Sequence, residues 1–355
     1  MKTVIITGSG GLIGSYASRF FVEKGFRVVG IDNDTRSVLF GEKASVKPTI
    51  ERLKELKGYE HMSLDIREIT TALMDVFDRA EELAGVIHCA AQPSHDWATL
   101  KPMDDFYINV VGTKNILYLT KIYNPEAVFV HLSTNKVYGD QPNQLSYIED
   151  SRRFVPNRNN NKYTVGIDET MSIDQCLHSV FGANKAAADI IVQEYGRYYG
   201  MNTVCFRGGC LTGSGHAGAE QHGFLSYLIK RAVQGQPYTI YGYGGKQVRD
   251  NIHAQDVVSA IWEYFQKPRP GEVYNIGGGW KSNCSVLEAI EMIEDVAGVK
   301  MTVTHDEKER KGDHKWYITN MDKFKSHYPN WKQKWGIVDI INDIYIYEKE
   351  LKNGN

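Results

Sequence analysis

Three features that would point to particular protein classes are missing from this chain of 355 residues. No apolar run approaches the ~18 residues that a membrane-spanning helix needs. Neither sign of charge dominates, because 41 Lys and Arg stand against 43 Asp and Glu, for a formal net charge of −2. A nucleic-acid binder or a protein of anionic membrane surfaces is therefore not expected. The five cysteines are an odd number without C-x-x-C spacing, so neither a disulfide framework nor a structural zinc site is expected.

The start of the chain also lacks the pattern of a secretory signal, because it runs directly into a strand-like segment. Together with the unpaired cysteines, this favours a cytoplasmic protein. Hydrophobic residues at 42% and charged residues at 24% give the balance of an ordinary globular protein. The length predicts two domains, or one large domain with an appendage.

Strand-like and helical segments alternate in the first part of the chain. This alternation predicts βαβ units, and hence a parallel sheet with right-handed crossovers. We therefore predict an α/β protein with a doubly wound, Rossmann-type parallel sheet. The predicted strands are 2–7, 27–31, 61–64, 86–91 and 127–133, and the predicted helices include 12–24, 104–122 and 179–199.

A second, smaller lobe is expected toward the C-terminus, where short elements alternate irregularly as in an α+β fold. A polar excursion at 141–172 interrupts the regular pattern, and 336–351 has the repeat of an amphipathic helix. The expected domains are 1–206 with a return segment at about 247–270, and the lobe 207–355.

A glycine-rich turn follows the first strand and opens the first helix. Gly8, Gly11 and Gly14 have the spacing G-x-x-G-x-x-G. Such a turn allows a dinucleotide pyrophosphate to approach the backbone, while the helix N-terminus offers free N–H groups to the phosphates. Asp32 closes the second strand, where a carboxylate accepts hydrogen bonds from a ribose and repels a 2′-phosphate. NAD is therefore favoured over NADP, although Arg36 nearby argues mildly the other way.

Several motifs resemble the extended short-chain dehydrogenase/reductase family of NAD-dependent nucleotide-sugar epimerases and dehydratases. The resemblance covers most of the chain, and within the family it is strongest to the CDP-tyvelose (CDP-paratose) 2-epimerases. The matching segments are 7–14, 32–33, 65–67, 88–92, 109–113, 133–139, Lys185, 245–250 and 274–278.

The resemblance implies a set of cofactor contacts. Asp65 and Ile66 would flank the adenine, and Lys185 would hold the nicotinamide ribose. The expected cofactor-binding residues are Gly8, Gly11, Leu12, Ile13, Gly14, Asp32, Asn33, Asp34, Arg36, Asp65, Ile66, Ala90, Ala91, Gln92, Asn109 and Lys185.

The resemblance also implies a catalytic set, and here the chain departs from the family. Thr134 matches the hydroxyl residue that hydrogen-bonds the reacting sugar oxygen. The family uses a Tyr-x-x-x-Lys pair, in which the lysine lowers the pKa of the tyrosine. Phe181 stands four residues before Lys185, so the usual acid/base hydroxyl is missing.

Three explanations of Phe181 remain open. The enzyme is active with a relocated acid/base, for which the candidates are His178, Lys136, Tyr163, Cys210 and a water held by Thr134. Alternatively, phenylalanine was introduced to trap a substrate complex, or the protein binds NAD and a nucleotide sugar without turnover.

The substrate side is expected to bind a nucleotide sugar, with a CDP-sugar favoured. Arg249 would bind the diphosphate, and Arg310 and Asp313 resemble a family Arg-x-x-Asp motif. The expected substrate-binding residues are Gln92, His95, Asn135, His222, Arg249, Arg310 and Asp313. No metal is expected, because the histidines of the loop 214–224 match no zinc spacing.

The same alignment of motifs separates two reactions. Dehydratases of the family carry an Asp-Glu pair after the catalytic threonine, whereas this chain has Asn135 and Lys136. An epimerase that acts at C2 of a CDP-hexose is therefore favoured over a 4,6-dehydratase. The resemblance further implies a homodimer or homotetramer, formed through the helices that begin near Asp104 and Ser179. Apolar positions such as Leu117 and Ile190 are expected to contribute to that interface.

Overall fold

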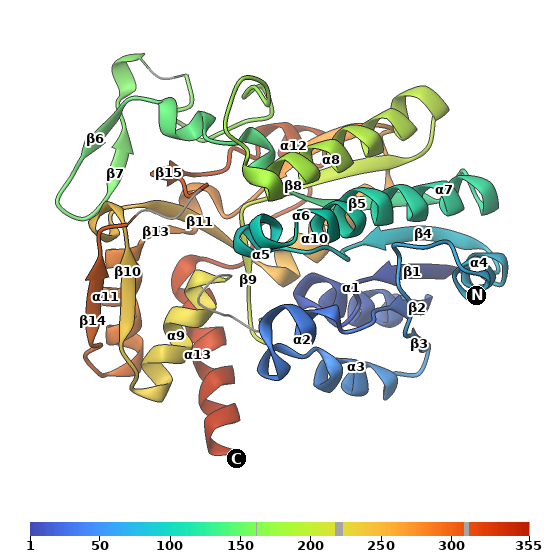
Figure 1. The fold of residues 1–355 in the computed structure, drawn as a ribbon, viewed down its shortest axis with the longest axis horizontal. Coiled ribbons are helices and arrows are strands. Elements are labelled where there is room, and N and C mark those ends of the chain that lie inside the picture. The colour runs from blue at the N-terminus through green and yellow to red at the C-terminus, as the bar shows by residue number, and fades with distance from the viewer. Residues whose placement is uncertain (161, 217–222, 309–311, 355) are drawn as a thin grey trace. The chain divides into compact units, whose positions relative to one another are not determined.

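The computed structural model describes residues 1–160, 162–216, 223–308 and 312–354. Its chain forms two compact units, each built from three separate stretches (Figure 1). The first unit contains 1–137, 180–207 and 257–274, and the second contains 138–179, 208–256 and 275–355. The segment 138–179, placed in the first domain by the sequence division, thus groups with the second unit.

A seven-stranded sheet forms the centre of the first unit. Its strand order is β12-β8-β5-β4-β1-β2-β3, and the pairings among β1 to β5 are all parallel. The strands are β1 (Thr3–Thr7), β2 (Arg27–Ile31), β3 (Tyr59–Met62), β4 (Leu83–His88), β5 (Val128–Thr134), β8 (Thr203–Gly208) and β12 (Glu272–Ile276). The order reverses between β1 and β4, and such a switch point is where doubly wound sheets bind their ligands.

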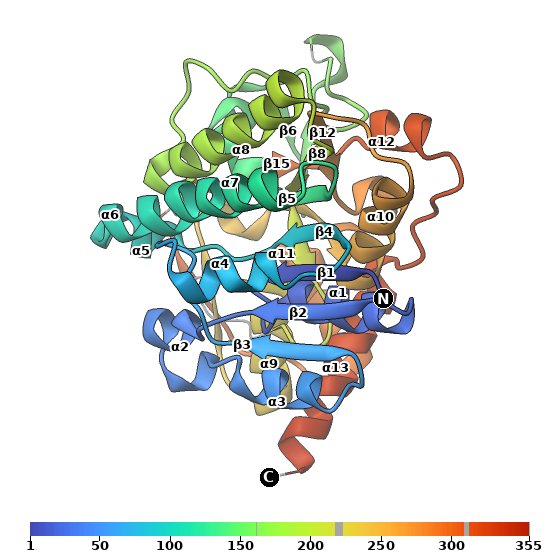
Figure 2. The ribbon, with the colours of Figure 1, turned by 90° about the vertical axis from the view of Figure 1, so that its right-hand side faces the viewer.

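Helices cover both faces of this sheet (Figure 2). On one face α1 (Leu12–Glu23) contacts α10 (Ala254–Gln266), with the rings of Phe21 and Phe265 5.0 Å apart. On the other face, apolar residues of α4 (Thr71–Asp78), α7 (Thr113–Tyr123) and α8 (Ser179–Tyr199) pack on the strands in one buried cluster. The helices that alternate with the strands in the sequence thus pack on both faces of the sheet.

Two predicted strands begin earlier than the sequence pattern indicated. β3 covers 59–62 instead of 61–64, and β4 covers 83–88 instead of 86–91. Their neighbours set these limits: Val28 pairs with Tyr59, and the last pair between β1 and β4 joins Thr7 to His88. An apolar run alone does not contain this register information.

The predicted helix 104–122 contains a wide turn. It begins as α6 (Pro102–Phe106), continues as a π-helical turn at Tyr107–Gly112, and ends as α7. Three further short helices belong to the first unit, namely α2 (Thr35–Phe40), α3 (Lys47–Lys54) and α5 (His95–Leu100). π-Turns often mark functional sites, because they insert an extra residue and redirect the side chains around it.

The second unit combines small sheets with a helical layer. Strands β13 (Asn283–Ser285), β11 (Val248–His253), β15 (Trp316–Tyr317) and β9 (Cys210–Thr212) form one sheet. The strands β10 (Tyr238–Tyr241) and β14 (Val303–Asp306) pair in parallel, and β6 (Tyr147–Glu149) pairs with β7 (Phe154–Pro156). The excursion at 141–172 therefore contains a short hairpin.

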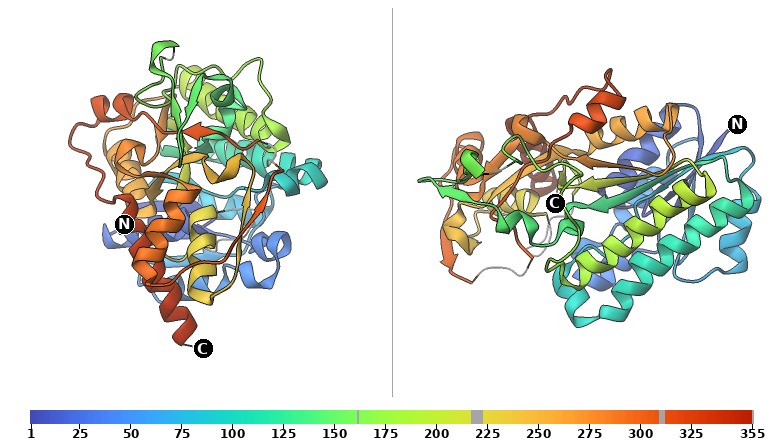
Figure 3. Two further views of the ribbon diagram at one scale, coloured as in Figure 1. Left: turned by 90° about the vertical axis from the view of Figure 1, so that its left-hand side faces the viewer. Right: turned by 90° about the horizontal axis from the view of Figure 1, so that it is seen from above.

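Three helices of this unit share one apolar core. They are α9 (Phe224–Gln234), α11 (Val286–Ala297) and α13 (Ile337–Asn353), and they lie side by side (Figure 3). A short helix, α12 (Asp322–His327), follows β15. A capping box starts α11, where Ser285 Oγ accepts from the Glu288 backbone N–H at 3.1 Å. Among the described residues, no helix is long and apolar enough to cross a membrane.

Candidate active site

The glycine turn after β1 depends on two close backbone approaches. Gly8 has φ +67°, and a Cβ there would lie 2.7 Å from the backbone nitrogen of Ala90. A Cβ on Gly14 would lie 2.0 Å from the carbonyl oxygen of Gly8. Gly11 is different, because the nearest atom to its ideal Cβ is the Gly8 oxygen at 3.3 Å. Gly8 and Gly14 are thus required by the protein itself, whereas the space beside Gly11 is less crowded by the protein's own atoms.

The N-terminus of α1 complements that space. Gly11 is its N-cap, no side chain caps the helix, and its first turn, which includes Leu12 and Ile13, contains no acidic residue. Its first N–H groups and the positive end of the helix dipole suit a phosphate. The turn therefore fits the pyrophosphate of a dinucleotide.

Asp32 lies next to this turn at the end of β2. Its carboxylate accepts the backbone N–H of Gly10 at 2.9 Å and that of Asp34 at 2.9 Å. Burial raises the pKa of Asp32, and these two N–H donors oppose that effect. Each oxygen retains a second lone pair, so the carboxylate can also accept the hydroxyls of a ribose.

The neighbouring Asp34 and Arg36 have partners within the protein. Asp34 is buried and accepts hydrogen bonds from Ser45 Oγ at 2.7 Å and the Val46 N–H at 2.8 Å. The guanidinium of Arg36 lies over the Phe40 ring, 4.9 Å from its centroid. Asp34 thereby fixes the loop around Asp32.

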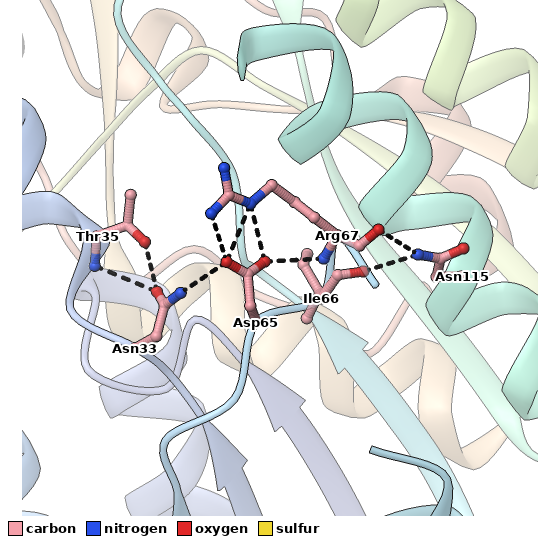
Figure 4. Close-up of polar contacts among 6 residues, drawn as sticks. All are labelled: Asn33, Thr35, Asp65, Ile66, Arg67 and Asn115. Atoms are coloured by element: carbon pink, nitrogen blue, oxygen red, sulfur yellow. Dashed lines mark hydrogen bonds and ion pairs between the residues drawn. The ribbon is translucent and has the colours of Figure 1, made fainter. Parts of the chain in front are cut away.

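The segment after β3 is held by a polar cluster (Figure 4). Asp65 accepts three hydrogen bonds from the Arg67 guanidinium, the shortest at 2.6 Å, and one from Asn33 Nδ2 at 3.3 Å. Hydrogen bonds and the charge of Arg67 lower the pKa of Asp65 against the opposing effect of its burial. Asn115 of α7 donates to the carbonyl of Ile66 at 3.0 Å. These contacts bring Asn33, Asp65 and Ile66 to the same edge of the sheet as Asp32.

The segment after β4 is anchored by a buried amide network. The Ala90 N–H donates to Thr7 Oγ1 at 3.2 Å, and Ala91 follows on the exposed side. Gln92 is fully buried, and its side-chain nitrogen donates to Asp105 Oδ1 at 2.6 Å. Asn109, in the π-turn, donates to the same oxygen at 2.9 Å. The buried Gln92 side chain thus holds the segment after β4 in place through its hydrogen bond to Asp105.

Thr134 is the last residue of β5, at the carboxyl edge of the sheet. Its hydroxyl accepts the Lys136 N–H at 3.2 Å and contacts Asn135 Oδ1 at 3.4 Å. Thr134 and Lys136 are partly exposed, and Asn135 is buried. Thr134 thus lies on the side of the sheet where doubly wound sheets bind their ligands.

The first turns of α8 place Phe181 and Lys185 one above the other. Lys185 is 3% exposed, and its ammonium donates to the Leu132 carbonyl of β5 at 2.8 Å. Burial lowers the pKa of Lys185 to about 8. Phe181 is buried, and its ring contacts that of His95 with the centroids 4.9 Å apart.

A pair of buried histidines beneath Lys185 was not predicted. His88 and His131 are register partners on β4 and β5, and their rings stack 5.4 Å apart. Lys185 Nζ lies 3.5 Å from His131 Nε2. Burial, reinforced by the charge of Lys185, lowers the pKa of both imidazoles, that of His88 to about 3. Aligning the carboxyl ends of the two strands would have revealed this pair.

The other proposed acid/base groups belong to the second unit. The His178 ring contacts Cys176, with Nε2 3.5 Å from Sγ. Tyr163 is buried, and Cys210 is the first residue of β9.

Two of the predicted substrate-binding residues of the second unit, Arg249 and Asp313, come together. Arg249 is nearly buried and forms an ion pair with Asp313, while its other terminal nitrogen donates to the Val248 carbonyl at 2.7 Å. Their pairing was not predicted from the sequence. His222 and Arg310 lie outside the described residues. Among the described residues, no group of three or more His, Cys, Asp or Glu could hold a metal.

Comparison with known proteins defines the class of this site. A profile of the NAD dependent epimerase/dehydratase family matches residues 4–277, and the chain belongs to that family. The chain is 29% identical to the CDP-paratose 2-epimerase of Salmonella typhi, over 98% of this chain and 99% of that protein. It is 28% identical to the dTDP-glucose 4,6-dehydratase of Haemophilus influenzae, over 84% of this chain and 82% of that protein.

A solved structure confirms the fold class. The dTDP-glucose 4,6-dehydratase from Bacillus anthracis, in complex with NAD, has a TM-score of 0.77 at 22% identity. The match covers 99% of this chain and 98% of that chain. The Rossmann-type sheet and the family resemblance predicted from the sequence are both confirmed.

Proposed function

We propose that this protein is an NAD-dependent nucleotide-sugar epimerase that inverts C2 of a CDP-hexose by transient oxidation and re-reduction. The observation that carries the proposal is the end of β5. Thr134 is followed there by Asn135 and Lys136, so the acid pair that the resemblance assigns to dehydratases is missing. The full-length similarity to a CDP-paratose 2-epimerase supports the same reaction.

The chain offers a contact for each part of NAD. The space beside Gly11 and the N-terminus of α1 would receive the pyrophosphate, and Asp32 the adenosine ribose. Asp65 and Ile66 would flank the adenine, and Lys185 would bind the nicotinamide ribose. When bound, NAD supplies the hydride acceptor and donor. Thr134 would orient the sugar oxygen by hydrogen bonding.

Phe181 supports a second candidate function, that of a protein that binds NAD and a nucleotide sugar without turnover. A phenyl ring cannot exchange a proton, so such a protein would lack the family's acid/base. The similarity to dehydratases keeps 4,6-dehydration as a third candidate.

A comparison of the wild type with Phe181→Tyr tests these functions. Both proteins are incubated with CDP-, UDP- and dTDP-hexoses, and products are identified by NMR. We expect the wild type to invert C2 of a CDP-hexose, and Phe181→Tyr to change the rate or the pH profile. Turnover by Phe181→Tyr alone would refute the active-epimerase proposal, and a 4-keto-6-deoxy product would identify a dehydratase.

The purified protein should carry NAD(H) and not NADP(H). The Asp32 carboxylate repels a 2′-phosphate and accepts ribose hydroxyls, and a hydrogen bond to a charged group contributes about 1.5–3 kcal/mol. Loss of this hydrogen-bond energy in Asp32→Ser should therefore weaken NAD binding roughly 10- to 100-fold. Calorimetric titration measures this, with the exposed Asp78→Ser on α4 as the matched control. Dominant NADP(H) in an extract of the wild type would contradict the role of Asp32.

We also propose that the chain forms a dimer through α7 and α8, which lie side by side (Figure 3). Lys121 of α7 lies 3.8 Å from the centroid of the Tyr199 ring of α8. Leu117 is wholly buried in the core and is not available, but Ile122 is 54% exposed and Ile190 is 47% exposed. Exposed apolar side chains on two neighbouring helices suit an interface between copies. A monomer in light scattering at micromolar concentration would refute it.

A further inference from the structure

An imidazole lies against the phenyl ring that replaces the family's tyrosine. His95 is the first residue of α5, and Phe181 is in the first turn of α8. Their ring centroids are 4.9 Å apart and their planes meet at 61°, in an edge-to-face contact. Phe181 is buried, whereas His95 remains partly exposed. A titratable ring therefore lies in contact with the ring that stands in place of the tyrosine.

A chain of hydrogen bonds fastens the start of α5 to α8. Ser94 caps α5 by accepting the Trp97 N–H at 3.2 Å, and the Gln92 side chain donates to the Ser94 carbonyl at 2.8 Å. Gln92 also donates to Asp105 Oδ1 at 2.6 Å. The other oxygen of Asp105 accepts from Asn184 Nδ2 at 2.6 Å. Asn184 lies on α8 between Phe181 and Lys185.

This network is built to hold a geometry. Asp105 is fully buried, and three side-chain amides donate to it, from Gln92, Asn109 and Asn184. Satisfied buried networks of this kind rigidify their surroundings, because each lost partner leaves an unpaired polar group in a low dielectric. The distance between the His95 backbone and the Phe181–Lys185 turn is thus fixed by residues that are themselves locked.

We infer that His95 is the acid/base of this protein and performs the proton transfer of the absent tyrosine; the inference rests on the proposed function. In the oxidation, the O–H bond of the sugar carbinol breaks and its proton passes to the His95 imidazole. The C–H bond breaks with its electron pair, and the hydride passes to NAD⁺. Ketone, NADH and imidazolium result. In the return, hydride adds to the opposite face and the imidazolium gives its proton to the oxygen.

The chemistry of histidine suits this exchange. The ordinary pKa of tyrosine is about 10, so tyrosine needs a neighbouring cation to act as a base near neutrality. The ordinary pKa of histidine, about 6.5, already lies near neutrality, where acid–base catalysis is efficient. Lys185 then serves only to bind the cofactor, and the tyrosine hydroxyl that the family uses is no longer required.

The test compares His95→Gln and His95→Ala with the wild type on the CDP-hexose that it inverts. We expect kcat to fall by about 10²–10⁴-fold in both variants, with KM changed less than about tenfold. The acidic limb of the kcat/KM profile should vanish in His95→Gln. Added imidazole should restore turnover to His95→Ala, and Phe181→Tyr should restore it to His95→Gln. The exposed His305→Gln on β14 is the control that should leave every quantity unchanged.

Two further readouts separate this role from a structural one. The NAD content and the thermal midpoint of His95→Gln should equal those of the wild type, because the role proposed for His95 is toward the reacting oxygen and not toward the cofactor. An acidic limb that persists in His95→Gln, or loss of that limb in His178→Ala instead, would overturn the inference. A wild type that dehydrates its substrate refutes C2 epimerisation alone, because oxidation still needs His95; a wild type inert toward every nucleotide sugar refutes both.

Discussion

Replacing Lys185 by methionine is expected to reduce turnover by about 10²–10³-fold, the usual cost of removing one preorganised donor from an active site. In the proposed site the Lys185 ammonium binds the nicotinamide ribose. Methionine has a similar length but carries neither the charge nor a hydrogen-bond donor. Purified Lys185→Met should also retain less NAD(H). Turnover and the cofactor content of the purified protein measure both effects. Retention of activity within about tenfold would contradict this role.

The same variant is expected to be no less stable than the wild type near neutral pH. Burial lowers the pKa of Lys185 from 10.5 to about 8, so the folded state binds its proton less tightly than the unfolded chain does. The cost to folding is about 3 kcal/mol, is complete below about pH 8 and disappears above the unfolded pKa of 10.5. The stability of the wild type should therefore rise relative to Lys185→Met between these two pH values. Urea unfolding at several pH values measures this, with the exposed Lys114→Met as control.

Asp189→Ala is expected to lower the free energy of unfolding by about 3–5 kcal/mol, because it removes the carboxylate that neutralises a buried cation. Asp189 is fully buried and binds Arg207 through both oxygens, at 2.8 and 3.1 Å. It also accepts from Ser133 Oγ at 2.6 Å and from Gln193 at 2.6 Å. Asp189 follows Lys185 by one helical turn, so this cluster anchors this part of α8 to β5 and β8.

A surface pair provides the matched comparison. Arg27 and Glu60 form an ion pair at 2.7 Å, but their side chains are 35% and 51% exposed. Glu60→Ala should change the free energy of unfolding by less than about 1 kcal/mol. The double variant Asp189→Leu with Arg207→Met should recover much of the stability, since neither charge is then buried. Equal effects of Asp189→Ala and Glu60→Ala in urea unfolding would refute the argument.

The fold class could be predicted from the sequence because the signals that indicate it are local. Apolar runs, the glycines of the first turn and Asp32 each report on a few consecutive residues, and their order identifies the family. The limits of β3 and β4 were displaced because register depends on a neighbouring strand. The π-turn of 107–112 was missed because an inserted residue leaves an apolar helical pattern nearly unchanged.

In the candidate site, too, local features could be predicted and contacts between distant segments could not. Gly8, Gly14 and Asp32 occupy positions that explain their identity, whereas contacts between distant segments were not foreseen. The pairing of Arg249 with Asp313, the contact of His95 with Phe181 and the hydrogen bond from Asn184 to Asp105 all join segments far apart in the chain. No spacing rule within one segment contains that information. The missing tyrosine was readable from the sequence, but its neighbour in space was not.

The sheet of the first unit is assembled from three stretches of chain, which has a consequence for synthesis on the ribosome. Because β8 pairs with β5 and β12 pairs with β8, β5 is an open edge until residue 208 has been made, and β8 until residue 276. Open edges of nascent strands are sites for wrong pairing and aggregation. Each closure must also span a long intervening segment, which slows it. A chain that stops before β12 therefore leaves the ribosome with β8, which the complete chain covers, as an edge of its central sheet.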